Sequence, residues 1–166
     1  MNINIDLSYF FNVLLVIFAF VMLTSLIRYL PDLIMDLRYK RVGLDETDNM
    51  SGREFEYWLK SQFKRMNYKV TLHRGYKDKG ADLIVINSQG QKFAVQAKKL
   101  NSGSIGAKVI GEALRGKLNY KCDRALVVTN QKFTEQALEE AEACGVILWD
   151  RKKLLEILED LKARGK

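Results

Sequence analysis

Residues 81–98 of this chain read ADLIVINSQGQKFAVQAK. Two runs rich in β-branched and other apolar residues, 81–87 and 92–98, are separated by the polar sequence SQGQ, a pattern typical of a β-hairpin. Successive side chains of a strand point to opposite faces, so Gln96 and Lys98 share one face of the second strand. The stretch therefore predicts two paired strands that bring polar side chains to one end of an otherwise apolar hairpin.

The segments on either side of the hairpin alternate between helical and strand patterns. Before it, Ser51 and Glu54 have the spacing of a capping box at the start of a helix, and residues 68–73 read as a short strand. After it, helices are predicted over residues 107–118, 134–143 and 151–163, and strands over 124–129 and 146–149. A hairpin followed by alternating strands and helices predicts an α/β fold, in which a mixed β-sheet is flanked by helices.

The amino-terminal part of the chain has a different composition. No charged residue occurs from Leu7 to Ile27, a run of 21 residues, which would be about 30 Å long as an α-helix and would match the hydrocarbon core of a bilayer. A cleaved signal peptide normally has a basic stretch before its apolar part, whereas here only Asp6 precedes it. A buried core helix is rarely apolar on every side over this length. We therefore predict a transmembrane helix within residues 1–30, with membrane contact through residues 7–27.

The charges around this segment predict its orientation. Basic residues follow it but none precedes it; they are Arg28, Arg38, Lys40 and Arg41. Because the more basic side of a span stays in the cytosol, we expect a single-pass protein of the cytoplasmic (inner) membrane with its C-terminal domain in the cytosol. Pro31 is expected to end or kink the helix. Residues 31–48 are then a juxtamembrane segment and polar linker, and residues 49–166 form the domain.

The net charge of +7 is unevenly distributed. Four of the 27 Lys and Arg residues and six of the 20 Asp and Glu residues lie in residues 1–48, so residues 49–166 carry a net charge of +9. A domain this basic suggests a polyanionic partner such as DNA. A well-solvated basic surface without such a partner is the alternative.

Histidine and cysteine are scarce in this chain. It has one histidine, His73, and two cysteines, Cys122 and Cys144. This excludes a zinc finger, a His-rich metal site and a disulfide scaffold. Any catalysis must therefore rest mainly on carboxylates, lysines, amides and a hard metal ion.

The hairpin carries a candidate site of that kind. Asp82 opens an apolar strand, where a carboxylate is costly unless it has a partner; a metal ion or Lys98 would serve. Gln96 and Lys98 project together from the neighbouring strand. An isolated Asp82–Lys98 ion pair with an incidental Gln96 is the alternative. The combination of these residues with a preceding helix that carries Glu54 and Glu56, in a basic domain, favours a functional site.

Several segments together carry a resemblance to a known family. They are SGREFEYWLKSQFKRMNYKV, DKGADLIV, FAVQAKK, ALVVTNQKFTEQALEEAEACGVILWD and KKLLEIL. With their G-x-E-F-E, G-A-D, Q-A-K and V-V-T-N-x-x-F-T motifs, about residues 50–160 resemble the Mrr-type restriction endonucleases of the PD-(D/E)xK nuclease superfamily. The resemblance implies a restriction-endonuclease-like fold. Gln96 stands where the superfamily motif has a carboxylate, but glutamine is the usual residue of the Mrr branch.

The resemblance also implies a metal-dependent endonuclease that hydrolyses phosphodiester bonds of DNA. Asp82 would be the main metal-binding carboxylate, and Glu56 would reach the same Mg²⁺ or Mn²⁺ directly or through water. Gln96 and the carbonyl group of Ala97 would complete the ligands, and oxygen ligands suit Mg²⁺. Lys98 would position the attacking water and offset charge in the transition state. Because Gln96 is uncharged, metal binding should lean more on the bound phosphate.

Further residues near the site remain open to two interpretations. Five basic residues flank it and could contact phosphates or simply be surface charges: Arg74, Lys77, Lys79, Lys99 and Lys108. Glu112 either faces the site or is an exposed helical acid. A homodimer would suit a nuclease that cuts two strands. The alternatives to an enzyme are a catalytically silent nuclease-fold module that binds DNA at the membrane and a basic domain that meets acidic lipid headgroups.

Overall fold

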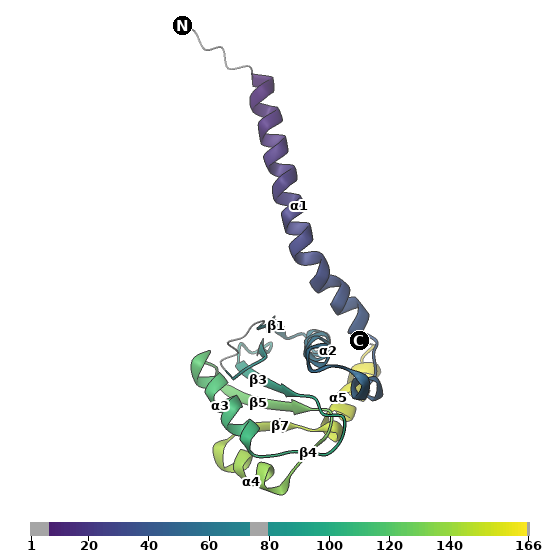
Figure 1. The fold of residues 1–166 in the computed structure, drawn as a ribbon, viewed down its shortest axis with the longest axis vertical. Coiled ribbons are helices and arrows are strands. Elements are labelled where there is room, and N and C mark those ends of the chain that lie inside the picture. Colours follow the sequence, from purple (N-terminus) through teal and green to yellow (C-terminus); the bar gives the residue numbers. More distant parts are fainter. Residues whose placement is uncertain (1–6, 74–79, 166) are drawn as a thin grey trace.

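A five-stranded β-sheet forms the centre of the domain in the computed structural model, which describes residues 7–73 and 80–165 (Figure 1). The strand order is β1-β2-β3-β5-β7. The strands are β1 Lys69–Leu72, β2 Leu83–Ile86, β3 Lys92–Lys98, β5 Arg124–Thr129 and β7 Ile147–Trp149. The first three strands pair antiparallel, whereas β3, β5 and β7 pair parallel. The predicted mixed sheet is thus confirmed.

Two pairs of helices cover the two faces of this sheet. Helices α2 (Gly52–Arg65) and α5 (Arg151–Ala163) pack on one face, against Leu126 and Val128 of β5. Helix α3 (Lys108–Asn119) and helix α4 (Glu135–Cys144) pack on the other face, against Ala125 and Val127. The period-two alternation of β5 therefore serves both layers, and Figure 1 shows the sheet between them.

Side-chain caps define where helices α2, α4 and α5 begin. The Ser51 hydroxyl accepts a hydrogen bond from the Glu54 amide at 3.3 Å, and the Glu54 carboxylate accepts one from the Ser51 amide at 2.9 Å. The predicted capping box is confirmed, and it satisfies amide groups that have no partner within the helix. Thr134 caps α4 and Asp150 caps α5 in the same way.

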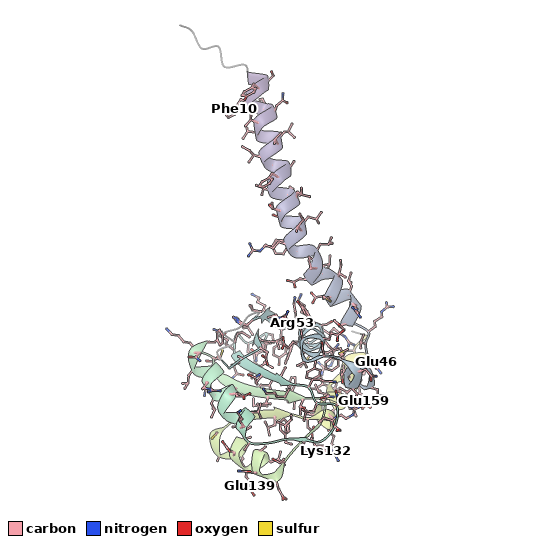
Figure 2. All side chains as sticks on the ribbon, in the orientation of Figure 1. Phe10, Glu46, Arg53, Lys132, Glu139 and Glu159 are labelled. Carbon is pink, nitrogen blue, oxygen red and sulfur yellow. The ribbon has the colours of Figure 1, made fainter. Side chains whose placement is uncertain are left out.

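Helix α1 (Leu7–Tyr39) extends far from the domain (Figure 1). In the part of the helix around Phe10, the side chains point outward on all sides, as Figure 2 shows. The sequence predicted that Pro31 would end or kink the helix. The helix does not end at Pro31 but continues to Tyr39. Contacts with α2 hold its last turns in place: the Ser61 hydroxyl donates to the Asp36 carbonyl at 3.2 Å, and the Gln62 amide group donates to the Tyr39 carbonyl at 3.2 Å.

A buried lysine also joins α1 to α2. Lys60 of α2 is only 5% exposed, and its ammonium group lies 3.5 Å from the Asp32 carboxylate and 3.7 Å from that of Asp36. Lys64 forms a second ion pair with Asp36. A buried charge is costly unless it is paired, so these contacts favour one orientation of α1 relative to the domain.

The segment after α1 differs from the polar linker that the sequence predicted. Residues Asp45–Asn49 form a short 3-10 helix, η1, and the side chains of Leu44 and Thr47 are buried. The Trp58 indole donates a hydrogen bond to the Val42 carbonyl at 2.9 Å. Because most of the segment is acidic and polar, its few buried residues could not be recognised in the sequence. Their tertiary contacts make the segment part of the domain surface.

A second, two-stranded sheet was not predicted. Strand β4 (Ser104–Ile105) pairs in parallel with β6 (Lys132–Phe133). Strands of two residues are too short to show the alternation from which strands are recognised in a sequence.

Candidate functional site

The hairpin register brings Asp82 and Gln96 into direct contact. The Gln96 side-chain amide donates to Oδ2 of Asp82 at 2.6 Å. Both side chains are buried, at 7% and 4% exposure. The contact arises because Leu83 of β2 lies opposite Val95 of β3, so the residues next to this pair, Asp82 and Gln96, lie at the same end of the hairpin.

The backbone of β3 supplies a second hydrogen bond to the same carboxylate. The amide group of Ala97 donates to Oδ2 of Asp82 at 2.7 Å. Strand β2 begins only at Leu83, so at this point a side chain replaces the neighbouring strand as the acceptor. Two donors that converge on one oxygen hold the carboxylate at this end of the hairpin and stabilise its charged form.

Lys98 lies on the same face as Gln96 and forms an ion pair with α3. Its ammonium group is 2.8 Å from the Glu112 carboxylate, and the two side chains are 38% and 20% exposed. Of the two interpretations of Glu112, the structure supports the one in which it faces the site. The pair leaves the end of Lys98 partly open to solvent.

The two helical glutamates of the candidate site have different surroundings. Glu54 closes the capping box of α2 and accepts a hydrogen bond from the Tyr39 hydroxyl at 3.3 Å. Glu56 is half-buried on α2, the helix on the face of the sheet opposite to Gln96 and Lys98. Contact between Glu56 and the metal therefore stays a prediction, because the Glu56 side chain would have to extend past the end of the sheet where Asp82 lies.

Two glycines set the position of the chain that leads into β2. Gly80 has a positive φ of 88°, and it lies so close to α3 that a methyl group on Gly116 would overlap its carbonyl oxygen. Only hydrogen atoms fit between the two backbones, so this contact holds the start of β2, and with it Asp82, against the helix that carries Glu112.

The predicted phosphate-binding residues are only partly placed. Lys99 is half-buried and donates a hydrogen bond to the Asn101 side chain, and Lys108 is exposed at the start of α3. Arg74, Lys77 and Lys79 lie outside the described residues. His73 packs against the Tyr120 ring, with 4.5 Å between ring centroids. Burial, aided by the charge of Lys92, lowers the pKa of His73 and favours its neutral form.

The role of one buried amide was not recognised in the sequence. Asn130, which follows β5, is fully buried and holds both backbone groups of Leu100: its oxygen accepts from the Leu100 amide at 3.0 Å, and its nitrogen donates to the Leu100 carbonyl at 2.9 Å. This clamp restrains the chain two residues beyond Lys98. In the sequence, Asn130 was marked only as the asparagine of the V-V-T-N-x-x-F-T motif, directly after an apolar strand.

Asp48, in the segment that follows α1, binds both the Asn130 side chain and Arg151. The Asn130 nitrogen also donates to Asp48 at 2.9 Å, and the Arg151 guanidinium donates to the same Asp48 oxygen at 2.8 Å. Burial acts to raise the pKa of Asp48, but the hydrogen bonds from Arg151 and Asn130 outweigh it and hold that pKa below its ordinary value. The hydrogen bond to Asp48 raises the pKa of Arg151, and this effect outweighs burial, which acts to lower the pKa.

The donor atoms at the site bear on the predicted metal ion. Across the described ranges 7–73 and 80–165, no three His, Cys, Asp or Glu side chains are grouped closely enough to hold a metal. The hairpin instead offers one carboxylate, one side-chain amide and the Ala97 backbone. Mg²⁺ is often bound by one or two carboxylates together with water and substrate phosphates, so this set of donors fits a site that the substrate completes.

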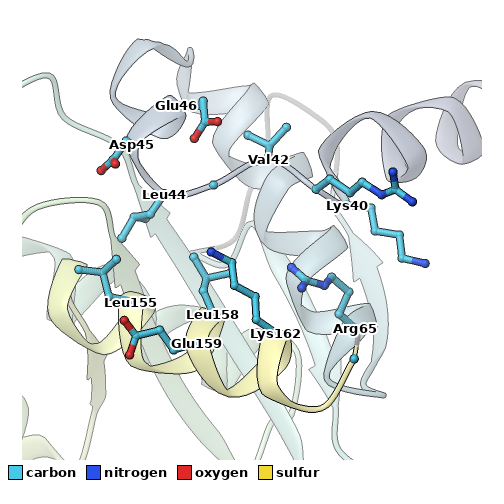
Figure 3. A pocket seen from close by; sticks show the side chains of 13 residues that line it. Lys40, Val42, Leu44, Asp45, Glu46, Arg65, Leu155, Leu158, Glu159 and Lys162 are labelled. Carbon is cyan, nitrogen blue, oxygen red and sulfur yellow. The ribbon is translucent and has the colours of Figure 1, made fainter.

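A cavity of about 690 Å³ lies elsewhere, between the segment after α1 and helix α5 (Figure 3). Its apolar lining includes Leu44, Leu155 and Leu158. In Figure 3, Asp45 lies toward one end and Arg65 toward the other. The cavity contains no residue of the Asp82 site, and its mixed charges select no class of ligand.

Comparison with solved structures shows what the fold is similar to. A protein of unknown function, AF1548, matches with a TM-score of 0.52 and 16% identity over 61% of this chain and 63% of that one. The DNA modification-dependent restriction endonuclease AspBHI matches with a TM-score of 0.51 and 19% identity over 78% of this chain and 34% of that one. The MspJI restriction endonuclease, in complex with a 27-mer oligonucleotide, gives a TM-score of 0.43 and 19% identity over 64% and 28%. At these identities the likeness to AF1548 and AspBHI concerns the fold alone, and the chain spans less than two thirds of each of the three structures.

Comparison of the sequence gives the family. No curated protein matches the chain. The model of the Mrr_cat restriction endonuclease family matches residues 47–158, which are more than half of the chain and include every strand, all of α2, α3 and α4, and the Asp82 site. The predicted resemblance over about residues 50–160 is confirmed, and the chain belongs to the Mrr_cat restriction endonuclease family.

Proposed function

We propose that this protein is a membrane-anchored, metal-dependent endonuclease that hydrolyses phosphodiester bonds of DNA. The observation that carries the proposal is the convergence of Gln96 and Ala97 on the Asp82 carboxylate, with Lys98 projecting from the same strand end. A buried carboxylate beside a partly exposed lysine, in a domain of net charge +9, suits a substrate that brings its own negative charge. Family membership supports the same reaction class.

The residues around Asp82 would bind the metal ion. When bound, Mg²⁺ or Mn²⁺ would polarise the scissile phosphate and lower the pKa of a bound water. Asp82 would hold the ion through its carboxylate, together with the side-chain oxygen of Gln96 and the carbonyl group of Ala97. Glu56 would contribute directly or through water.

Lys98 acts on the substrate side of the site. Its ammonium group, held by Glu112, would donate hydrogen bonds to the attacking water or to a phosphate oxygen. These hydrogen bonds become stronger as negative charge develops in the transition state. Because Lys98 is 38% exposed, a phosphate has access to it. Lys99 and Lys108 would contact neighbouring phosphates of the backbone, as would Arg74, Lys77 and Lys79, and these contacts orient DNA without reading its sequence.

Helix α1 supports the membrane part of the proposal. Among the described residues, one helix, Ser8–Tyr39, is long and apolar enough to cross a bilayer, and none of its most apolar stretch is buried. The absence of burial argues against a core helix, although a signal sequence has a similar length and composition. With basic residues only on its C-terminal side, the domain would face the cytosol. Extraction of the full chain from membranes by detergent, but not by alkaline carbonate, tests this part.

The catalytic part is tested by cleavage with matched variants. The purified full chain in detergent is incubated with supercoiled, linear and single-stranded DNA and with Mg²⁺ or Mn²⁺. We expect cleavage by the wild type and losses on the order of 10²-fold or more for Asp82→Ala and Lys98→Ala. Lys152→Ala, which removes an exposed lysine of α5, should cut normally. Equal cleavage by all four proteins would refute the assigned site.

A catalytically silent DNA-binding module is the second candidate. The uncharged Gln96 and the lack of a three-residue acidic group among the described residues favour it. It predicts DNA binding that weakens steeply with salt, and no cleavage by the wild type with either metal ion.

A further inference from the structure

The leucines of α1 follow a regular spacing on one face of the helix. Leu23, Leu26, Leu30, Leu33 and Leu37 are separated by three, four, three and four residues. This is the a/d spacing of a coiled coil, in which apolar residues recur every 3.5 residues on average. All five side chains are exposed, by 42% to 64%. The geometry points to pairing of α1 with α1 of a second copy of this chain, in parallel, along this leucine seam.

The same spacing continues toward the start of the helix. Ala19, Val16 and Asn12 precede Leu23 by four, seven and eleven residues, which extends the seam through the apolar run. Inside a membrane, helices pair through small residues that allow close approach and through polar side chains that hydrogen-bond across the interface. Ala19 fits the first role and Asn12 the second, because an Asn on the seam would find its counterpart in the partner helix.

The domain leaves this face of the helix free. At 100° per residue, the residues that dock on α2 lie away from the seam. Asp32, which pairs with Lys60, and Tyr39, which is buried, lie on the opposite side of the helix. Asp36, which also pairs with Lys60, flanks the seam. Two chains can therefore pair along the seam while each domain stays on the outer side of its own helix.

The charges on α1 are compatible with such a pair. No charged residue occupies a seam position between Asn12 and Leu37. Asp36, which flanks the seam, is already paired with Lys60 and Lys64 of its own chain. A parallel pair related by a two-fold axis would therefore bring no unpaired like charges together, and it would keep both domains on the same side of the membrane.

Three leucines of the seam lie where water would otherwise reach them. Transfer scales imply that a fully buried leucine-sized side chain removes roughly 100 Å² from solvent, so pairing would remove roughly 300 Å² per helix at Leu30, Leu33 and Leu37. Within the apolar run, van der Waals packing of the seam residues and a hydrogen bond between the two Asn12 side chains would hold the helices together. Leu30, Leu33 and Leu37 follow Arg28, outside the charge-free run, so a second helix would also shield them from water.

Disulfide cross-linking in the full chain tests the pairing. In a Cys144→Ser background, which removes the exposed native thiol, single variants Leu30→Cys, Leu33→Cys and Leu37→Cys are oxidised in detergent and in lipid vesicles. We expect disulfide-linked dimers for all three. The control is Arg28→Cys, an exposed position on the opposite side of α1, which should pair but should form no disulfide-linked dimer. Absence of dimers in both media, or equal cross-linking at Arg28, would overturn the proposal.

A mass measurement adds a test without engineered cysteines. By light scattering in detergent we expect twice the chain mass for the wild type and a shift to the single mass for Leu30→Ala/Leu37→Ala. A single mass for the wild type would also overturn the pairing. Pairing does not depend on catalysis, so Asp82→Ala should dimerise like the wild type. A dimer that cuts no DNA would therefore refute the proposed function and leave this inference standing.

Discussion

The Asp82 carboxylate and the Gln96 amide form a buried pair that carries at most one negative charge. With glutamate at position 96, two carboxylates would share the same space, and their repulsion would raise a pKa or require a cation. The amide avoids that repulsion when no metal is present. The result should be a more stable site without metal and weaker metal binding.

The variant Gln96→Glu tests this balance. Its melting temperature in the presence of chelator should fall below that of the wild type, because a second buried carboxylate is unpaired. Its melting temperature should rise more on addition of Mn²⁺, because binding to the folded state alone stabilises it. Gln89→Glu, in the exposed hairpin turn, should change neither value. Equal Mn²⁺-induced shifts in wild type and Gln96→Glu would contradict the assigned ligand.

The pKa of Asp48 gives a pH dependence of stability. Because its folded-state pKa lies below the ordinary value of 3.8, Asp48 contributes stability that is present above that value. This contribution is lost as pH falls through the lowered folded-state pKa. Unfolding by urea should therefore show the wild type more stable than Asp48→Asn at pH 7, with a difference that shrinks below pH of about 4. A difference that stays constant down to pH 2 would show that the ion pair with Arg151 contributes nothing.

At the scale of elements, the contact between Gly80 and α3 aligns the start of β2 with the helix that carries Glu112. Asp82 follows two residues after Gly80, and Glu112 precedes Gly116 by one helical turn. A side chain at Gly80 or Gly116 would push the hairpin away from α3. Asp82 would then move away from Glu112, which holds Lys98.

Two glycines of α3 provide a matched comparison. Gly116→Ala should destabilise the domain by about 1–3 kcal/mol or more, because its methyl group overlaps the Gly80 backbone. Gly111→Ala meets no atom within 4 Å and should stabilise the helix by up to about 1 kcal/mol. Urea denaturation measures both, and cleavage should fall only for Gly116→Ala. Equal effects of the two substitutions would show that the close contact does not position the site.

At the scale of the whole molecule, the domain extends further toward α1 than the predicted boundary at residue 49. Tyr39 and Leu44 belong to the same core as Phe55 and Trp58. Asp48 reaches across to α5 and to the end of β5. The last turns of α1 and the segment after it therefore join α1 to the domain through packed contacts, rather than through a free linker.

Truncation tests this extended boundary. A chain that begins at residue 49 should unfold at a lower urea concentration than one that begins at residue 31, since loss of the buried Leu44 alone removes roughly 1.5–3 kcal/mol. It also leaves the Trp58 indole without its acceptor. The chain from residue 31 should keep the stability of the domain in the full chain. Equal midpoints for the two truncated chains would show that residues 31–48 act only as a linker.

The sequence by itself determined the sheet and its helices, because each main strand and helix has a periodic apolar pattern and a cap or turn at its ends. Strand β3, strand β5 and helix α5 occur at the predicted residues. Period-two alternation also placed Gln96 and Lys98 on one face of β3. The hairpin pattern placed Asp82 at the start of the neighbouring strand.

Only the tertiary structure decided which partners these residues have. The two hydrogen bonds on Asp82, the pairing of Lys98 with Glu112, and the hydrogen bonds of Asn130 to Leu100 and Asp48 join positions 14 to 82 residues apart. The docking of α1 and the packing of residues 42–48 likewise depend on distant contacts. No local periodicity encodes such contacts, because they arise when elements that each fold by their own pattern bury their faces against one another.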